Sequence, residues 1–200
     1  MLSIEHHIRM RIKKAPKGEL FFTEDFLQYG SAKAVSKALE RMAAGQAITR
    51  VARGIYSRLE IDPLIGSVKP DTEAIAKAIS RRDRARLIPT GAAALHAMGL
   101  TTQIPLNVVY LTDGSARKIS SGRRTITFRK TTPKNLSAKG KISGLAIQAM
   151  KELGKDQITT REASEIIKQL TREEPRRLEH DIRLAPEWIR VIMRNALKKS

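Results

Sequence analysis

Apolar residues recur every three or four positions between Ala32 and Ala44, and this spacing predicts an amphipathic helix with one face turned to a core. Ser31 directly precedes the segment, where its side chain can accept from the first free backbone N–H groups of the helix. Gly45 directly follows and is expected to end the helix. The apolar stripe consists of Val35, Ala38, Leu39 and Met42.

Shorter elements are predicted on both sides of this helix. Residues 3–14 carry three isoleucines four positions apart, which predicts a first helix. Residues 19–22 are expected to form a short strand, followed by a short helix that Thr23 caps. Gly30 is expected to supply a left-handed or turn conformation before the Ala32–Ala44 helix. Residues 48–51 and 54–56 are expected to be two short strands around a turn.

This order of elements, from Phe21 to Ser57, predicts a winged helix-turn-helix, which is a fold that reads DNA. The residues at the start of a recognition helix must be small or polar, because bulky apolar side chains would keep the helix from the base edges. A hairpin that carries Arg50 and Arg53 can contact phosphates or reach into the minor groove. A small helical subdomain with ordinary solvated lysines is the alternative. The residues expected to bind DNA are Ser31, Lys33, Ser36, Lys37, Arg41, Arg50 and Arg53.

The remainder of the chain predicts a small mixed sheet and then a helical part. Residues 60–71 contain prolines and a glycine and indicate a linker. Strands are expected at 85–88, where Pro89 would end the strand, and at 106–111, 118–120 and 125–129. Helices are expected at 72–82, 90–98, 143–153 and 160–170, with a mostly exposed charged segment at 173–184 and a last helix that Pro186 opens. The fold class is therefore α+β, with domains at 1–60 and 61–200.

The charge of the chain indicates a polyanionic partner. The 38 Lys and Arg residues stand against 20 Asp and Glu residues, which gives a net charge of +18. Between residues 61 and 140 there are 14 basic and 5 acidic residues, so the excess is strongest in the middle of the chain. Nucleic acid is the natural partner for such a chain, although acidic proteins and membranes also attract positive charge.

Six basic residues without an intervening acid lie on the predicted central strands. They are Arg117, Lys118, Arg123, Arg124, Arg129 and Lys130. A charged strand edge protects a sheet from aggregation, but six cations exceed that need. The sequence favours a surface that binds either nucleic acid or an acidic protein.

The sequence lacks the catalytic motifs that we considered, and we therefore expect that the protein is not an enzyme. The chain has no cysteine, no phosphate-binding GxxxxGK[ST] loop and no GxSxG elbow. His180-Asp181 lacks the further ligands that a metal phosphohydrolase needs, and we expect no metal and no cofactor. No apolar run has the length of a bilayer span or a signal peptide, so we expect a cytoplasmic protein that does not bind membranes.

Two segments resemble one known family. Residues 30–57 read GSAKAVSKALERMAAGQAITRVARGIYS and resemble the N-terminal winged helix of the AbiE-type antitoxins of bacterial type IV toxin–antitoxin systems. Residues 89–131 read PTGAAALHAMGLTTQIPLNVVYLTDGSARKISSGRRTITFRKT and resemble the beginning of the antitoxin's C-terminal domain. The two segments, in this order, cover roughly half of the chain.

The resemblance implies an autorepressor that binds inverted repeats of double-stranded DNA at its own promoter. It also implies that the second domain neutralises a nucleotidyltransferase-like toxin, generally without a stable complex between the two proteins. Two alternatives remain open. One is a winged-helix transcription factor with a ligand-sensing C-terminal domain, and the other is an RNA-binding protein that uses the basic central sheet. The sequence does not determine the oligomeric state.

Overall fold

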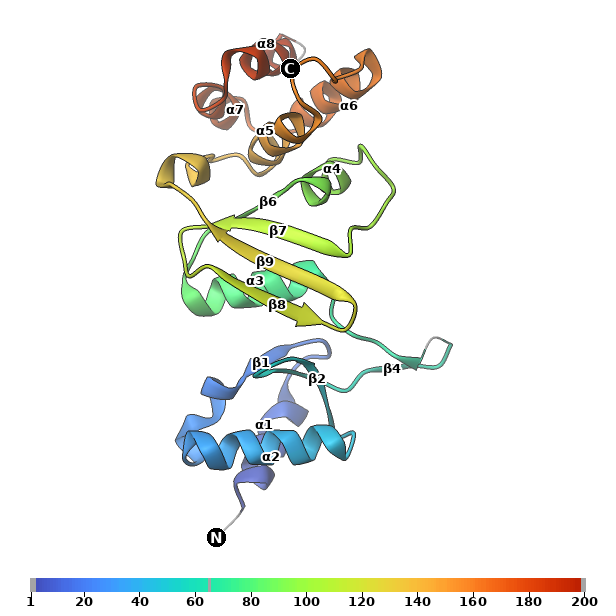
Figure 1. Ribbon diagram of the computed structural model, residues 1–200, viewed down its shortest axis with the longest axis vertical. Helices are drawn as coiled ribbons and strands as arrows, with labels where there is room; N and C mark the ends of the chain where they lie inside the picture. The colour runs from blue at the N-terminus through green and yellow to red at the C-terminus, as the bar shows by residue number, and fades with distance from the viewer. Residues whose placement is uncertain (1–2, 65, 199–200) are drawn as a thin grey trace. The chain divides into compact units, whose positions relative to one another are not determined.

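The computed structural model describes residues 3–64 and 66–198 of the chain (Figure 1). It is a mixed α+β protein, as the sequence predicts. The chain forms two compact units, Met1–Ala78 with Ile119–Arg123, and Ile79–Lys118 with Arg124–Ser200. The boundary at residue 60 stays a prediction.

The first unit places two helices and a 3-10 helix around a small antiparallel sheet. The strand order in this sheet is β1-β3-β2. Two short strands of two residues each, β4 and β5, pair with each other in the segment predicted as a linker. The elements are α1 (Ile4–Lys14), β1 (Leu20–Phe22), η1 (Thr23–Tyr29), α2 (Ala32–Ala44), β2 (Ile48–Ala52), β3 (Ile55–Arg58), β4 (Ile61–Asp62) and β5 (Gly66–Ser67).

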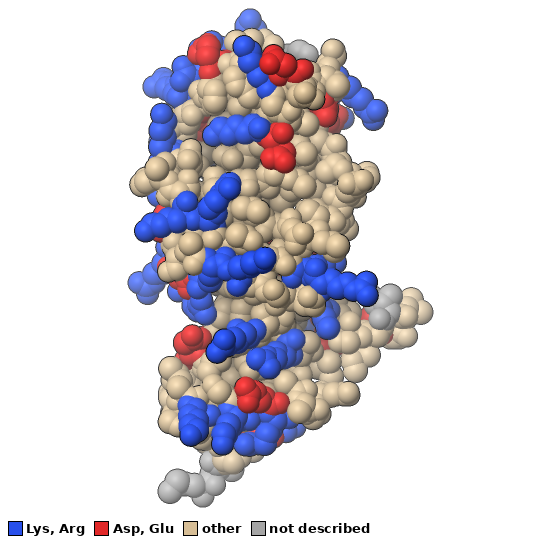
Figure 2. All heavy atoms as spheres, viewed as in Figure 1, with Lys and Arg blue, Asp and Glu red and all other residues tan. Residues whose placement is uncertain are grey.

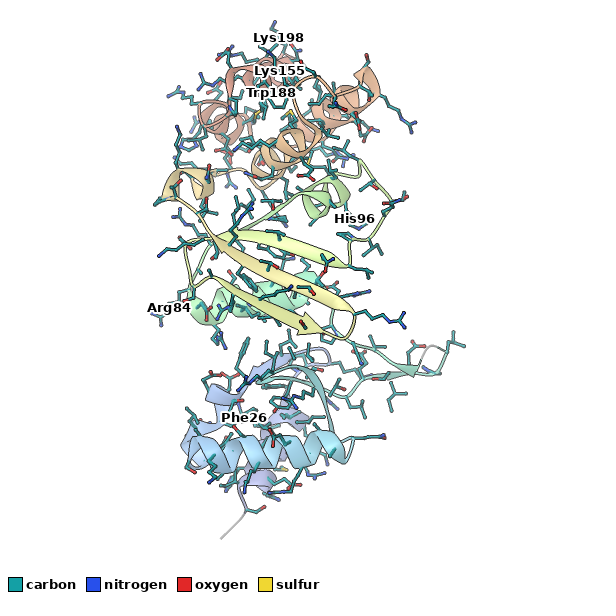
Figure 3. All side chains as sticks on the ribbon, viewed as in Figure 1. Phe26, Arg84, His96, Lys155, Trp188 and Lys198 are labelled. Carbon is teal, nitrogen blue, oxygen red and sulfur yellow. The ribbon has the colours of Figure 1, made fainter. Side chains whose placement is uncertain are left out.

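The core of the first unit confirms the predicted apolar stripe of α2. Val35 and Leu39 are fully buried, and they belong to one cluster with Ile8 of α1 and Phe26 of η1 (Figure 3). The start of α2 is capped as the sequence predicts, because the Ser31 hydroxyl accepts from the backbone N–H of Ala34 at 3.3 Å. The helix therefore has a fixed start and one face fixed to the core.

The segment before α2 differs from the sequence-based expectation. It is a 3-10 helix, and Thr23 does not cap it. Asp25 makes a different hydrogen bond: its Oδ2 accepts from the backbone N–H of Phe22, the residue before the 3-10 helix, at 2.8 Å. A carboxylate inside the first turn satisfies the preceding free amide, as the acidic partner of a capping box does.

Gly30 is needed for space and not for a left-handed backbone. Its φ of 164° lies in the extended region, so the predicted turn conformation is wrong. A Cβ at this position would lie 2.6 Å from Cδ1 of Ile4. The glycine therefore leaves room for the end of the Ile4 side chain, which would otherwise have to shift.

The second unit contains most of a four-stranded sheet with the order β6-β7-β9-β8. β7 runs antiparallel to β6 and parallel to β9, with Val109 opposite Thr127. Pro89 lies inside β6, opposite Tyr110, and does not end the strand as predicted. An edge strand tolerates proline because one side of it needs no ladder hydrogen bond. The helix α3 and the strand β8 are each divided between the two units. The bounds of these elements are α3 (Thr72–Asp83), β6 (Leu87–Thr90), α4 (Ala92–Ala97), β7 (Asn107–Thr112), β8 (Arg117–Ser121) and β9 (Arg124–Lys130).

Helices form the C-terminal part of the second unit around a shared apolar core. Met150, Ile166, Leu178, Ile189 and Met193 are fully buried in it. Trp188 is partly buried and packs against this cluster, in line with its predicted role in the core. The helices are η2 (Pro133–Leu136), α5 (Lys141–Leu153), α6 (Thr160–Leu170), α7 (Pro175–Ile182) and α8 (Glu187–Leu197).

Two carboxylates from distant segments hold the beginning of α5. Asp181 is fully buried and accepts from the backbone N–H groups of Lys139 and Gly140, each at 2.8 Å, and from the hydroxyl of Ser143. Glu173 Oε2 accepts from the N–H groups of Ile142 and Ser143 at 2.7 and 3.2 Å. The prediction that residues 173–184 are mostly exposed is therefore wrong at the positions that bind α5. Negative charge at a helix N-terminus also complements the helix dipole.

We expect Asp181→Ala to lower the free energy of unfolding by about 3 kcal/mol, because it leaves several buried donors without an acceptor. Chemical denaturation of the full chain measures this loss. Glu179→Ala removes an exposed acid from the same helix and should change stability by no more than about 0.5 kcal/mol. Equal losses in the two variants would show that the buried carboxylate does not hold α5.

Candidate nucleic-acid interface

The outer face of α2 presents two lysines to solvent. Lys33 and Lys37 are both exposed and lie four residues apart, so they share one side of the helix, away from the buried stripe. Arg41 continues this side but lies 3.6 Å from Glu5 Oε2 on α1. Lys33 and Lys37 are therefore the free charges of this face, and part of the charge of Arg41 is compensated.

The two serines on this helix have different roles. The Ser31 hydroxyl accepts from the backbone of α2, and this bond fixes its position at the first turn. Ser36 is half-buried in the middle of the helix. Both are small, so neither blocks an approach of the helix start to a groove.

The turn between β2 and β3 carries one exposed arginine at its tip. Arg53 is exposed, and Gly54 follows with φ of +70°, a conformation that glycine adopts without strain. Arg50 lies within β2, opposite Tyr56 of β3, and is not part of the turn itself. Burial raises the pKa of Tyr56, while the nearby charge of Arg50 lowers it and that of Glu40 raises it. Arg50 is thus exposed beside a neutral phenol.

Lys33, Lys37, Arg50 and Arg53 form no salt bridge with another residue that the structure describes. Some other basic residues of this unit are used inside it. Arg11 donates to the carbonyl of Asp25 at 2.7 Å and lies 5.5 Å above the Phe26 ring. Arg11 is thus a structural cation, whereas the four on α2 and the hairpin, like other exposed lysines of the unit, remain available to a partner.

The second predicted basic cluster is not uniform. Arg117 pairs with Asp83, and its guanidinium lies 5.4 Å from the centre of the Phe128 ring. Desolvation and the charge of Arg82 lower its pKa. Arg117 therefore binds inside the second unit and contributes little to an open surface.

The other members of this cluster occupy different sides of the sheet. Lys118, Arg123, Arg129 and Lys130 are exposed, and Arg124 is half-buried. Arg129 and Lys130 are neighbours in one strand, so their side chains point to opposite faces. The sheet brings together fewer cations than the sequence suggests, because alternation divides them. Figure 2 shows Lys and Arg side chains spread over the visible face, with fewer Asp and Glu between them.

Two further properties of the described residues bear on function. No group of three or more His, Asp or Glu side chains within residues 3–64 and 66–198 has an arrangement that could hold a metal ion. In the same ranges, no helix combines the length and the apolar character needed to cross a membrane.

The chain belongs to a protein family that its sequence identifies directly. Residues 7–178 match the family described as "Family of unknown function (DUF6088)". No curated protein matches the sequence. Among solved structures, the chain is similar to the RV2827C protein from Mycobacterium tuberculosis, with 10% identity and a TM-score of 0.49 over 98% of this chain and 81% of that one.

We expect Ser31→Ala to destabilise the protein by about 1 kcal/mol, because the first turn of α2 loses its cap. Ser31→Gly should cost only a few tenths of that, roughly 0.3 kcal/mol, since glycine is tolerated at this position. Urea denaturation compares them with Ser36→Ala, which removes a hydroxyl from the middle of the same helix. If Ser36→Ala is the more harmful change, the cap does not determine the stability of α2.

Proposed function

We propose that the first unit is a winged helix-turn-helix that binds double-stranded DNA. α2 is the recognition helix, and the β2–β3 hairpin is the wing. The observation that carries this proposal is the set of four exposed cations, Lys33, Lys37, Arg50 and Arg53, on these two elements and without an acidic partner among the described residues. Such cations contact phosphates, while the small residues at the start of α2 allow it to enter the major groove.

We further propose that the protein is a cytoplasmic antitoxin of the AbiE type, which represses its own promoter and neutralises a nucleotidyltransferase-like toxin. The support is the resemblance of residues 30–57 and 89–131 to that family. The second of these segments exposes Ile104 and Leu106, with 66% and 56% of their surface open to solvent. Exposed apolar side chains of this kind are suited to contact with another protein, and direct contact with the toxin is not required by the proposal.

The alternative of a single-stranded RNA reader is disfavoured by the aromatic residues of the sheet. Such readers stack bases on exposed aromatic rings. Tyr110 and Phe128 are only 7% and 2% exposed, and their rings stack on each other with centroids 6.1 Å apart. Neither ring is open to a base.

The test of DNA binding removes the four cations together, as Lys33→Ala, Lys37→Ala, Arg50→Ala and Arg53→Ala in the full chain. We expect weaker binding to the DNA upstream of the native gene and a shallower salt dependence, by about one unit of slope for each lost phosphate contact. Fluorescence anisotropy at several salt concentrations measures both quantities.

The matched control removes the same number of charges from the sheet, as Lys118→Ala, Arg123→Ala, Arg129→Ala and Lys130→Ala. This variant should retain most of the affinity and the slope of the wild type. If the sheet variant loses binding and the α2–hairpin variant keeps it, the DNA-binding surface lies on the sheet and the proposal is wrong.

The antitoxin function is tested by co-expression with the proposed partner, a nucleotidyltransferase-like toxin of a type IV toxin–antitoxin system. We expect growth to be restored by the wild type and also by the variant with four substitutions on α2 and the hairpin, because neutralisation is assigned to residues 61–200. Growth arrest that persists with well-expressed wild-type protein would exclude this function and leave the DNA-binding proposal intact.

A further inference from the structure

One surface of the second unit differs from the rest of this basic protein because it carries no charge. No Lys, Arg, Asp or Glu occurs between Arg86 and Asp113, in a chain in which 29% of the residues are charged. The exposed residues of α4 and of the loop at 98–106 form this uncharged surface. Ile104 and Leu106 of the loop are 66% and 56% exposed. Figure 2 shows an area without charged side chains over α4 and this loop.

The loop that presents these two side chains is held at both ends. Near its beginning, Nδ1 of His96 on α4 lies 3.3 Å from the carbonyl oxygen of Thr101 (Figure 3). At its end, the carbonyl of Leu106 accepts from the backbone N–H of Thr125 on β9 at 2.9 Å. A segment that is already ordered loses little conformational freedom when a partner binds. Ile104 and Leu106 are therefore presented in a fixed arrangement.

The character of the uncharged surface favours a protein as its partner. It offers no cation to a phosphate, so it is not suited to nucleic acid. Depletion of charged residues is the compositional mark of the centre of a protein–protein interface. The chain has a net charge of +18, and two copies of it repel each other where basic faces meet. A surface without charge is the place where two copies can approach each other without this repulsion.

Two opposite charges border the uncharged surface, one on each side of β7. Glu152 of α5 is exposed, and its Oε2 lies 3.6 Å from the position that a Cβ on Gly91 would occupy, directly after β6. Arg124 begins β9, one residue before the Thr125 that binds Leu106. β7 lies between β6 and β9 in the sheet, so the acid and the arginine are on different sides of it. Neither forms a salt bridge with another residue that the structure describes.

We propose that the uncharged surface is a two-fold interface between two copies of this chain, with Ile104 and Leu106 at its centre. In such an interface, each residue that contacts a second residue of the other copy is matched by the reverse contact. Glu152 of one copy therefore pairs with Arg124 of the other, and the pair occurs twice. A second copy satisfies both border charges, whereas an acidic partner would satisfy only the arginine and a basic partner only the glutamate.

The interface is independent of the proposed DNA-binding surface, because all of its residues belong to the second unit. If the DNA-binding proposal stands, a dimer supplies two first units for the two halves of an inverted repeat. If that proposal falls, the contact between the copies is unaffected. Association is measured in the absence of DNA, so the failure of one proposal is distinguished from the failure of the other.

The first test is sedimentation equilibrium of the full chain at several concentrations, where we expect a monomer–dimer equilibrium. Ile104→Ser and Leu106→Ser should each weaken association about a hundred-fold, because a central apolar contact contributes about ten-fold and occurs twice in a two-fold dimer. The matched control is Val191→Ser, which changes a 54% exposed side chain on α8, outside the uncharged surface. It should dimerise as the wild type does, and a loss equal to that of Ile104→Ser would contradict the proposal.

The second test exchanges the two border charges. Glu152→Arg and Arg124→Glu should each weaken association about ten-fold, because each brings like charges together. The variant with both changes should regain most of the wild-type association, since every pair is again of opposite sign. A wild type that stays monomeric, or a double variant no better than the single ones, would overturn the proposal. A monomeric wild type that binds the toxin, with loss of this binding in Ile104→Ser, would assign the surface to the toxin instead.

Discussion

Burial of one face of α2 is the constraint on which the first unit depends. Its apolar stripe packs with Ile8 of α1 and with Phe26, which no solvent reaches. A helix fixed in this way must present its opposite face outward, and that face carries Lys33 and Lys37. Gly30 belongs to the same arrangement, because a side chain there would collide with Ile4 at the beginning of α1. The position of the proposed recognition helix therefore follows from packing, and the lysines do not have to stabilise it.

Several of the acidic residues of this basic protein stabilise its structure. Asp181 and Glu173 hold the beginning of α5, and Asp83 holds Arg117. Asp113 accepts from the backbone and side chain of Arg86, and these bonds lower its pKa. With these acids engaged in this way, the cations of α2 and the hairpin keep their charge available for partners. The same chain thus has internally paired charges and externally unpaired ones.

The sequence predicts what depends on neighbouring residues and misses what depends on distant ones. The stripe and the cap of α2 are local, and the structure confirms both. The role of Asp181 does not depend on neighbouring residues, because its carboxylate oxygens accept hydrogen bonds from backbone amides 41 and 42 residues away in the sequence. Because this role depends on distant residues, the sequence pattern at His180-Asp181 indicated only a catalytic motif, which we rejected. The pairing of Arg117 with Asp83 was also hidden, since a tertiary contact creates it.

The central claim is that α2 lies in the major groove of DNA, and the absence of cysteine from the chain allows a direct test. A DNA-cleaving probe attached to Ala32→Cys, at the exposed start of α2, reports which nucleotides lie nearby on the DNA upstream of the native gene. The same probe on Ser120→Cys reports for β8, where the side chain is also exposed. We predict localised cleavage from position 32 at the bound site and weak or diffuse cleavage from position 120. Localised cleavage only from position 120 would contradict this prediction.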